Sequence, residues 1–338
     1  MPQTRRDLID AVFHNQKADR VPVGFWHHFL PHPHTDDAWK HPSLTDDALA
    51  AQADFYEAFP PDLLKVMTDG FFGYPHPAIR KAMDSAADIG DFAPLGKHSR
   101  WYEDQIAFAR KLSFRYGRDV PLFYNLFTPY RALGFAQEAA GHPFDFVDWI
   151  RRDKAAVQRV LAVLAADYAA LAEGLLTEGG MDGIYFSVNN VDRNRLSEAE
   201  YREVVRPGEI EVLEAANRVR DNQILHICGY RGFRNHLSWY TEYPVRAVNW
   251  ATHVEGVPLS EGKTLFGGKA VIGGFGQTAD DLLYAGSEEE IRKETARLLQ
   301  DAGHTGVILG ADCTIPPDTD VRRLEWVREE AARLSRGQ

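Results

Sequence analysis

Short apolar runs alternate along the chain with longer amphipathic segments. The apolar runs contain few polar residues, as expected for parallel strands that are buried on both faces. Eight such runs are candidate strands, at residues 21–25, 64–67, 122–127, 183–186, 223–227, 247–250, 270–273 and 307–310. This regular recurrence predicts a sheet in which each strand is followed by a helix.

The segments between these runs carry helical signals. Residues 153–176 have apolar side chains at helical spacing. Ser197, with a glutamate three residues later, is typical of a capping box. Ser287 precedes three glutamates, which suit the positive end of a helix dipole. A last helix is predicted at about 319–334, after two consecutive prolines that break the preceding segment.

Eight strand–helix alternations predict a single domain, residues 1–338, folded as a (β/α)8 barrel. A helix over residues 5–13 is expected ahead of the first strand. A doubly wound open sheet is the alternative, but neither a G-x-G-x-x-G motif after a strand nor a Walker loop is present. Residues 71–99 have little periodicity and three prolines. They are predicted to form a long loop over the active face.

Composition narrows the class of protein. The chain is 44% hydrophobic and 26% charged, which is ordinary for a soluble globular protein. The formal net charge is −11 without a basic stripe, which argues against a nucleic-acid partner. No uninterrupted apolar run approaches the ~18 residues of a membrane span, and the N-terminal residues lack the apolar core of a signal peptide. With only two cysteines, the expected location is the reducing cytoplasm.

Both cysteines follow predicted strands. His226 and Cys228 are two residues apart, so on a strand their side chains point to the same face, and Cys313 follows the last predicted strand. One histidine and two thiolates form a known catalytic zinc set that leaves a fourth position open for water or substrate. Three unrelated buried side chains are the competing interpretation, because free cysteine is common in protein cores. Their shared position at strand ends puts the two interpretations on equal terms.

The ends of the other predicted strands add candidates for catalysis or substrate binding: Trp26, His27, His28, Asp69, Tyr130, Asn189, Asn190, Asn249 and Glu255. Asp69 could bind or protonate a substrate, although Thr68-Asp69-Gly70 is also good turn chemistry. Tyr130 could line the pocket or pack within a loop, and the two adjacent asparagines could bind substrate or form a turn. Four histidines lie within residues 27–34 without regular spacing. This favours a solvated loop with one substrate-contacting histidine over a second metal site.

With these residues placed, the chain resembles the uroporphyrinogen decarboxylase superfamily over nearly its whole length. The resemblance rests on segments 19–23 (DRVPV), 62–66 (DLLKV), 182–187 (DGIYFS), 225–229 (LHICG) and 308–317 (ILGADCTIPP). The superfamily has a (β/α)8 barrel. It includes decarboxylases and zinc methyltransferases that move methyl groups from corrinoid proteins to coenzyme M or folate.

The resemblance favours the methyltransferase branch. The decarboxylases carry arginines after the first strand, where this chain has none, and a histidine where it has Cys313. His226, Cys228 and Cys313 match the zinc ligands of the methyltransferases, while Asp69 matches the key aspartate of the decarboxylases. Asn249 and Glu255 are candidates for the fourth zinc ligand.

A corrinoid is not expected on this chain itself. The usual lower-ligand pattern, D-x-H-x-x-G, is matched most closely by residues 251–256, which lack the aspartate. A corrinoid, if used, is expected on a separate protein that docks at the active face.

The leading hypothesis is a cytoplasmic zinc methyltransferase, in which Zn²⁺ activates a thiol or similar acceptor for attack on a methyl group. Asp69, Tyr130 and His27 are the predicted catalytic residues; the predicted pocket residues are Trp26, His28, Asn189, Asn249 and Glu255. The donor is a corrinoid protein or a small molecule, and the chain is expected to be a monomer or homodimer. The alternatives are a metal-free decarboxylase of a small substrate that uses Asp69, and a non-catalytic barrel that binds a metal or a corrinoid protein.

Overall fold

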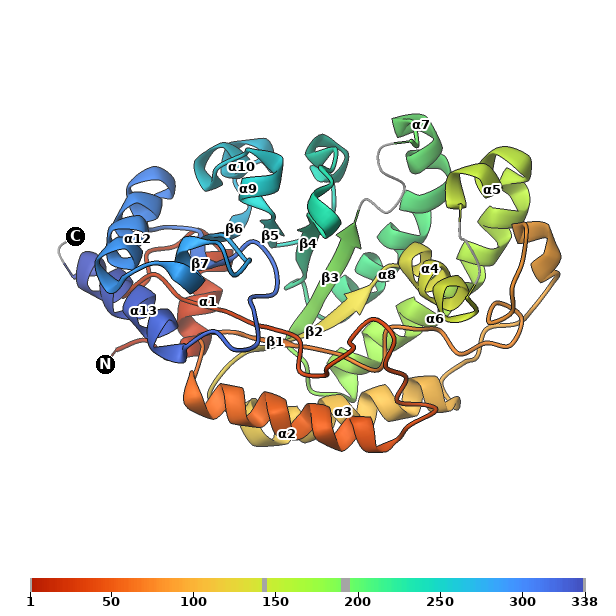
Figure 1. Ribbon diagram of the computed structural model, residues 1–338, viewed down its shortest axis with the longest axis horizontal. Helices are drawn as coiled ribbons and strands as arrows, with labels where there is room; N and C mark the ends of the chain where they lie inside the picture. The colour runs from red at the N-terminus through yellow and green to blue at the C-terminus, as the bar shows by residue number, and fades with distance from the viewer. Residues whose placement is uncertain (1, 142–144, 190–194, 337–338) are drawn as a thin grey trace.

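A parallel sheet of seven strands organises the molecule (Figure 1). The computed structural model describes residues 2–141, 145–189 and 195–336. Neighbouring strands in the sheet are also consecutive in the chain, and every described pair is parallel. The strands are β1 (Leu64–Val66), β2 (Leu122–Phe127), β3 (Gly183–Asn189), β4 (Ile224–Cys228), β5 (Ala247–Trp250), β6 (Ala270–Phe275) and β7 (Val307–Ala311). This order is that of a strand–helix barrel.

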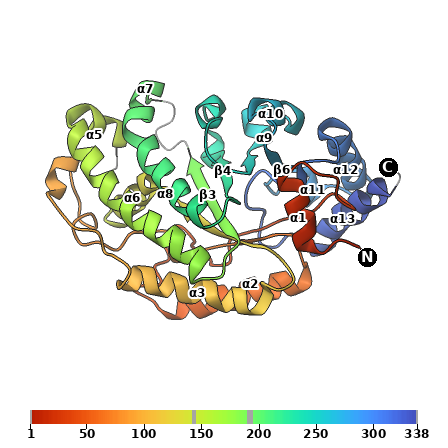
Figure 2. The same cartoon turned by 180° about the vertical axis from the view of Figure 1, so that it is seen from behind.

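Most of the helices connect the strands and cover the outer face of the sheet (Figures 1 and 2). They are α1 (Arg5–Phe13), α2 (Ser43–Ala58), α3 (Arg100–Tyr116), α4 (Pro129–Ala139), α5 (Phe146–Arg152), α6 (Lys154–Thr177), α7 (Glu198–Glu200), α8 (Arg206–Val219), α9 (Thr252–Glu255), α10 (Leu259–Leu265), α11 (Leu282–Ala285), α12 (Glu288–Ala302) and α13 (Val321–Ser335). Single turns of 3-10 helix lie at Ala86–Ile89, Tyr230–Gly232 and Leu237–Tyr240, and a π-helical turn, Tyr201–Val205, precedes α8.

The predicted first strand, residues 21–25, forms only a single parallel bridge, between Val23 and Leu309 of β7. Leu309 N donates to the Pro22 carbonyl at 2.9 Å, and on the other side Asp62 N donates to the Val23 carbonyl at 2.9 Å. The segment therefore lies between β7 and the residues that precede β1. The predicted α/β fold with a parallel sheet is confirmed, but the predicted eight-stranded barrel is not. The described sheet has seven strands, because residues 21–25 have too few ladder hydrogen bonds to form an eighth.

Gly310 lies beside this bridge, where the backbones of β7 and the bridging segment are in close contact. A Cβ on Gly310 would lie 2.6 Å from the Gly24 carbonyl oxygen. Such a distance is too short for any side chain, so β7 and the bridging segment approach one another at a position that requires glycine.

The apolar core has two parts, as the alternation of side chains along each strand requires. The outer part fills the space between the sheet and its helices. The inner part lies inside the sheet and includes Phe123, Tyr185, Ile224 and Ile308, together with Ile9, Val12 and Phe13 of α1. Helix α1 therefore packs against the inward-facing side chains. It matches the helix predicted ahead of the first strand, and a capping box formed by Thr4 and Asp7 fixes its start.

The predicted helices at the other marked positions are also present. The segment predicted at 153–176 is α6, which is capped by Asp153, and Ser287 caps α12 through a capping box with Glu290. Among the described residues, α6 is the only helix long and apolar enough to cross a membrane by length and composition. However, 67% of its apolar window is buried inside the protein. It packs against α8 and α3 as a core helix.

Residues 71–99 form the expected long loop, with one turn of 3-10 helix at Ala86–Ile89. The loop is fastened to α6 by the buried carboxylate of Asp167, which accepts hydrogen bonds from Leu95 N (2.6 Å) and Gly96 N (2.9 Å) and from the Tyr74 hydroxyl. The described loop residues do not line the cavity at the strand ends. Phe72 instead packs behind two of its walls, Phe127 and Phe135.

Candidate metal centre

His226, Cys228 and Cys313 come together at the carboxyl ends of β4 and β7. Their candidate ligand atoms all lie within 4.8 Å of one another. The two sulfur atoms are 3.8 Å apart, and Cys313 Sγ is 3.3 Å from His226 Nε2. Zn–S bonds of about 2.3 Å at tetrahedral angles separate two thiolate sulfurs by about 3.8 Å. The three side chains therefore fit a tetrahedral metal ion, whereas the sulfur separation is far beyond the ~2.05 Å of a disulfide.

Asn249 on β5 fixes which nitrogen of His226 faces the cysteines. Its Nδ2 donates to the carbonyls of Ile272 (2.9 Å) and Ala311 (3.3 Å), so its Oδ1 is left to accept from His226 Nδ1 at 2.5 Å. This hydrogen bond holds a proton on Nδ1. Nε2 carries the lone pair and points toward Cys313, as in metal-bound histidines whose other nitrogen is hydrogen-bonded.

The two thiols are hydrogen-bonded to one another, and this contact shifts their pKa values in opposite directions. A hydrogen bond from Cys228 holds the pKa of the Cys313 thiol well below its ordinary value, and the interactions with His226 and Lys65 add to the lowering against the effect of burial. The same hydrogen bond, together with burial, raises the pKa of Cys228 well above its ordinary value. The contact therefore favours the thiolate form of Cys313 and the thiol form of Cys228, and a metal bound to both sulfurs would displace the remaining proton.

A cavity of about 140 Å³ lies next to this group. It is lined by His28, His34, Lys65, Met67, Asn125, Phe127, Arg131, Phe135, Ser187, Asn189, His226, Cys228, Arg231, Gln277, Cys313 and Thr314. The cavity thus has two aromatic walls, several amide and hydroxyl groups, and the candidate metal ligands on one side. A small polar molecule in it would lie beside the two sulfur atoms.

Sequence reasoning missed Lys65 as a residue that lines the cavity. It is central in β1, it is 4% exposed, and it lines the cavity from inside the sheet. Burial lowers its pKa to about 8, although the two cysteines and Asp69 oppose this shift. A lone lysine in an otherwise apolar strand was the available signal, because lysine is rarely buried without a partner.

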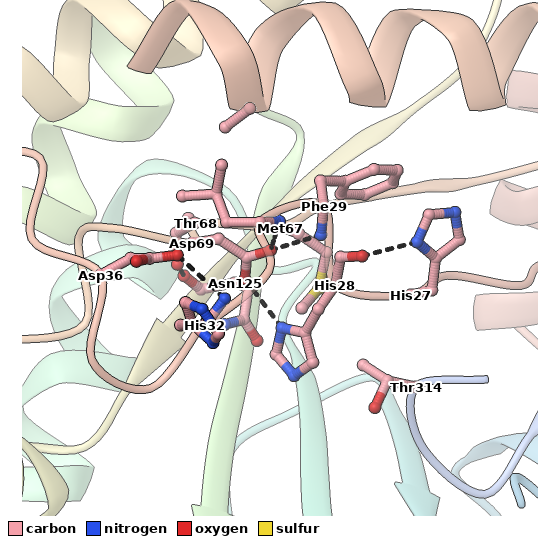
Figure 3. A network of polar contacts seen from close by, with 12 residues as sticks. His27, His28, Phe29, His32, Asp36, Met67, Thr68, Asp69, Asn125 and Thr314 are labelled. Carbon is pink, nitrogen blue, oxygen red and sulfur yellow. Dashed lines mark hydrogen bonds and ion pairs between the residues drawn. The ribbon is translucent and has the colours of Figure 1, made fainter. Parts of the chain in front are cut away.

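Asp69 is placed differently from expectation. It is 1% exposed and does not line the cavity. Its carboxylate accepts from His28 Nδ1 at 2.8 Å, Phe29 N at 2.5 Å and Leu30 N at 3.2 Å, so its acceptor capacity is largely used within the protein (Figure 3). Asp69 therefore orients His28, which does line the cavity, instead of facing a substrate.

Three other predicted site residues lie outside the cavity lining. His27 turns its ring onto Phe29 and Phe55, and its Nδ1 contacts the His28 carbonyl at 2.7 Å (Figure 3). Tyr130 is buried in α4 with its ring 4.0 Å from that of Phe146. Trp26 is also buried; its ring packs on Tyr185 beneath Lys65. Packing against aromatic neighbours, which a single sequence does not reveal, draws all three away from the cavity.

Of the remaining predicted site residues, some lie at the cavity or the ligand group and others do not. Asn189 lines the cavity, as expected, whereas Asn190 lies outside the described residues. Glu255 on α9 is not in the ligand group, because its carboxylate accepts from Asn235 N and Nδ2 at 2.9 Å. Asn249 has both ends of its amide occupied and supports His226 from behind. Neither candidate for the fourth ligand therefore stands at the three-residue group.

Two solved structures share this fold over nearly the whole chain. One is a methyltransferase from Methanosarcina mazei, with 14% sequence identity and a TM-score of 0.72 over 98% of this chain and 99% of that chain. The other is a B12-independent methionine synthase from Shewanella sp. W3-18-1 in complex with selenomethionine. It is 14% identical, with a TM-score of 0.57 over 94% of this chain and 97% of that chain. At this identity the likeness establishes the fold alone.

Sequence comparison identifies the family. The model of the uroporphyrinogen decarboxylase (URO-D) family matches residues 73–334, well over half of the 338-residue chain. A search of curated proteins gives no match. The chain belongs to the uroporphyrinogen decarboxylase family.

Proposed function

We propose that this member of the family is a zinc-dependent methyltransferase that uses His226, Cys228 and Cys313 as metal ligands. The observation that carries the proposal is the geometry of the three ligand atoms, with a sulfur–sulfur separation of 3.8 Å and a histidine nitrogen whose lone pair faces the sulfurs. The likeness to a methyltransferase and a methionine synthase supports methyl transfer as the reaction class.

The residues of the chain have separate roles in this proposal. Asn249 holds His226 in the tautomer that presents Nε2. When bound, zinc acts as a Lewis acid that keeps an acceptor thiol in its thiolate form at neutral pH. Phe127 and Phe135 provide apolar walls that exclude water from the nucleophile. His28, oriented by Asp69, faces the same cavity and can take up the proton that the acceptor loses.

The methyl donor in this proposal is a separate corrinoid protein or a small methylated compound, which approaches through the cavity. In the overall reaction the acceptor thiolate attacks the methyl carbon, a carbon–sulfur bond forms, and the donor leaves with the electron pair of the broken bond. A metal-free decarboxylase acting through Asp69 has less support, because Asp69 does not line the cavity and already accepts three hydrogen bonds.

Metal analysis of the purified protein tests the proposal. We expect about one zinc per chain in the wild type and strong loss of zinc in Cys228→Ser and in Cys313→Ser. Ser187→Ala is the matched control, because Ser187 lines the same cavity outside the ligand group and should leave zinc unchanged. Absence of zinc from the wild type, or unchanged zinc in both cysteine variants, would overturn the proposal.

An assay of methyl transfer separates an enzyme from a metal-binding barrel. The wild type is expected to transfer a methyl group from methylcobalamin to a small thiol, and both cysteine variants are expected to lose this activity with their zinc. Zinc binding without transfer from methylcobalamin or from a methylated corrinoid protein would instead favour the non-catalytic alternative.

A further inference from the structure

The cavity beside the candidate metal centre is basic, although the protein as a whole is acidic. Its described lining includes Lys65, Arg131 and Arg231 but neither aspartate nor glutamate, while the net charge of the chain is −11. Arg131 is paired with Glu138 at 2.9 Å, and Arg231 lies in an exposed turn. Lys65 is therefore the basic side chain to explain at the inner end of the cavity.

Lys65 is a buried cation without an acidic partner among the described residues. Its Nζ lies 4.3 Å from the centre of the Tyr185 ring and 5.0 Å from that of Trp26. Within the described part of the chain no carboxylate pairs with it, and no carbonyl accepts from it. Two aromatic faces compensate only part of the cost of burying an ammonium group. A residue kept in this state has a reason outside the folding of the chain.

Metal binding would leave the positive charge of Lys65 less compensated. Negative charge on the two cysteine sulfurs favours the protonated form of Lys65. A bound divalent cation would be neutralised by the two thiolates. The charge of Lys65 would then have no counterpart in the cavity, and an anion supplied from solution would be attracted to it.

A second group in the cavity also lacks a partner. Asn125 on β2, the strand next to β1, is 2% exposed and lines the cavity. Its Oδ1 accepts from the Ser187 hydroxyl at 2.8 Å, whereas its buried Nδ2 has no hydrogen-bond partner. An unpartnered buried donor is costly in a folded protein and is typical of a site completed by a ligand atom that accepts hydrogen bonds.

We propose that Lys65 and Asn125 form a subsite for the carboxylate group of the substrate, so that the small molecule acting at the metal centre is an organic acid. The two residues provide a cation and a neutral N–H donor, which together match one carboxylate. The inference rests on the proposed function in one respect, because the metal centre supplies the reacting end of the same cavity. The carboxylate subsite itself requires no metal.

Three small thiols of different charge test the subsite on zinc-loaded protein. Calorimetric titration should show that 3-mercaptopropionate binds about tenfold to a hundredfold more tightly than neutral 2-mercaptoethanol, as expected for hydrogen bonds to a charged group. Positively charged cysteamine should bind most weakly. Equal affinities, or a preference for the neutral or the positive thiol, would overturn the proposal.

Substitution of Lys65 identifies the group responsible. Lys65→Met should abolish the preference for 3-mercaptopropionate while the zinc content stays that of the wild type. Lys111→Met removes an exposed lysine of α3 and should keep the preference. Should Lys65→Met fail to fold, Asn125→Asp provides an independent test. The new carboxylate would form an ion pair with Lys65 and so abolish the preference for 3-mercaptopropionate. A preference that survives in a folded variant of either kind contradicts the subsite.

A metal-free background separates this inference from the proposed function. In Cys228→Ser/Cys313→Ser protein both thiols are absent, so Lys65 loses its only nearby anions in the described cavity. Propionate should still bind, measured by ligand-observed NMR, and its neutral amide, propionamide, should bind at least about tenfold more weakly. Failure of zinc binding with propionate binding intact would refute the metal centre alone. Loss of the propionate preference with zinc intact would refute the subsite alone.

Discussion

Two polar clusters at the strand ends contain similar residues but differ in how fully their hydrogen bonds are satisfied. In the cluster of His226, Cys228 and Cys313, the histidine nitrogen and both sulfurs face one another across 3.3 to 3.8 Å. In the cluster around Asp69, the carboxylate accepts three hydrogen bonds from its own chain (Figure 3). The first cluster has ligand atoms to offer to a metal, whereas the second is complete and serves to hold the segment after Trp26.

The comparison shows that a polar side chain at a strand end is not by itself a functional group. Asp69 follows β1 and His226 lies near the carboxyl end of β4, so both were equally good candidates from their position. The number of donors that the fold directs at each side chain distinguishes them. A carboxylate whose hydrogen bonds are all made stabilises the local structure. A group of metal-ligand atoms without such partners is able to bind a ligand from solution.

The largest expected effect compares the two histidines directly. His226→Ala removes one of three ligand atoms and should weaken zinc binding by about a thousandfold or more, because three ligands define a zinc site of this class. His28→Ala removes the equivalent residue of the other cluster and should leave zinc affinity within about threefold of the wild type. Competition with a chelator of known zinc affinity measures both. Comparable losses in the two variants would refute the distinction between the clusters.

The next effect concerns stability. Asp69→Ala leaves three buried or half-buried donors without an acceptor and should lower the free energy of unfolding by about 4 kcal/mol. Zinc stoichiometry in the folded variant should not change. Urea unfolding measures the loss, with exposed Asp10→Ala on α1 as the control for removing a carboxylate. A loss below about 1 kcal/mol would show that the hydrogen bonds around Asp69 contribute little.

In a third buried cluster, the carboxylate accepts hydrogen bonds from neutral tyrosine hydroxyls. Glu209 on α8 is 2% exposed and accepts from the hydroxyls of Tyr201 (2.6 Å) and Tyr243 (2.5 Å). Burial raises its pKa to about 7, despite these hydrogen bonds. The folded protein therefore binds a proton there between about pH 4.5 and 7 that the unfolded chain has released.

It follows that Glu209 lowers the stability progressively as the pH rises through that window. In Glu209→Gln this part of the pH dependence should disappear, which amounts to about 3 kcal/mol between pH 4.5 and 7. Unfolding by urea at several pH values measures it, with exposed Glu57→Gln as the control. A pH profile that is the same in Glu209→Gln and the wild type would contradict the raised pKa.

The smallest expected effect concerns the support of the metal ligand. Asn249→Ala removes the oxygen that holds the proton on His226 Nδ1 and should weaken zinc binding about tenfold to a hundredfold, as for other residues that orient metal-bound histidines. Asn249→Asp keeps an accepting oxygen and should lose less. Unchanged affinity in Asn249→Ala would mean that the strand geometry alone orients His226.

Much of the framework could be predicted from the sequence. Six of the seven strands begin at the predicted residue, and α1 has the predicted bounds, because apolar runs and capping residues act locally. The edge of the sheet was harder to predict. Residues 21–25 have the composition of a strand, but ladder pairing depends on both neighbours. Only the contacts of Val23 with Leu309 and Asp62 determine how that segment joins the sheet.

The sequence by itself determined the candidate ligand set: a histidine and a cysteine two residues apart on one strand, and a second cysteine after the last strand. The tertiary structure alone decided what surrounds them. It brought Cys313 within reach of His226, used Asn249 as the partner of the imidazole, and withdrew Asp69, His27 and Tyr130 from the cavity. It also placed Lys65 inside the sheet, where no carboxylate of the described residues pairs with it. The physical reason is that side-chain direction along a strand follows from local alternation, whereas the partners of a side chain come from segments far apart in the chain.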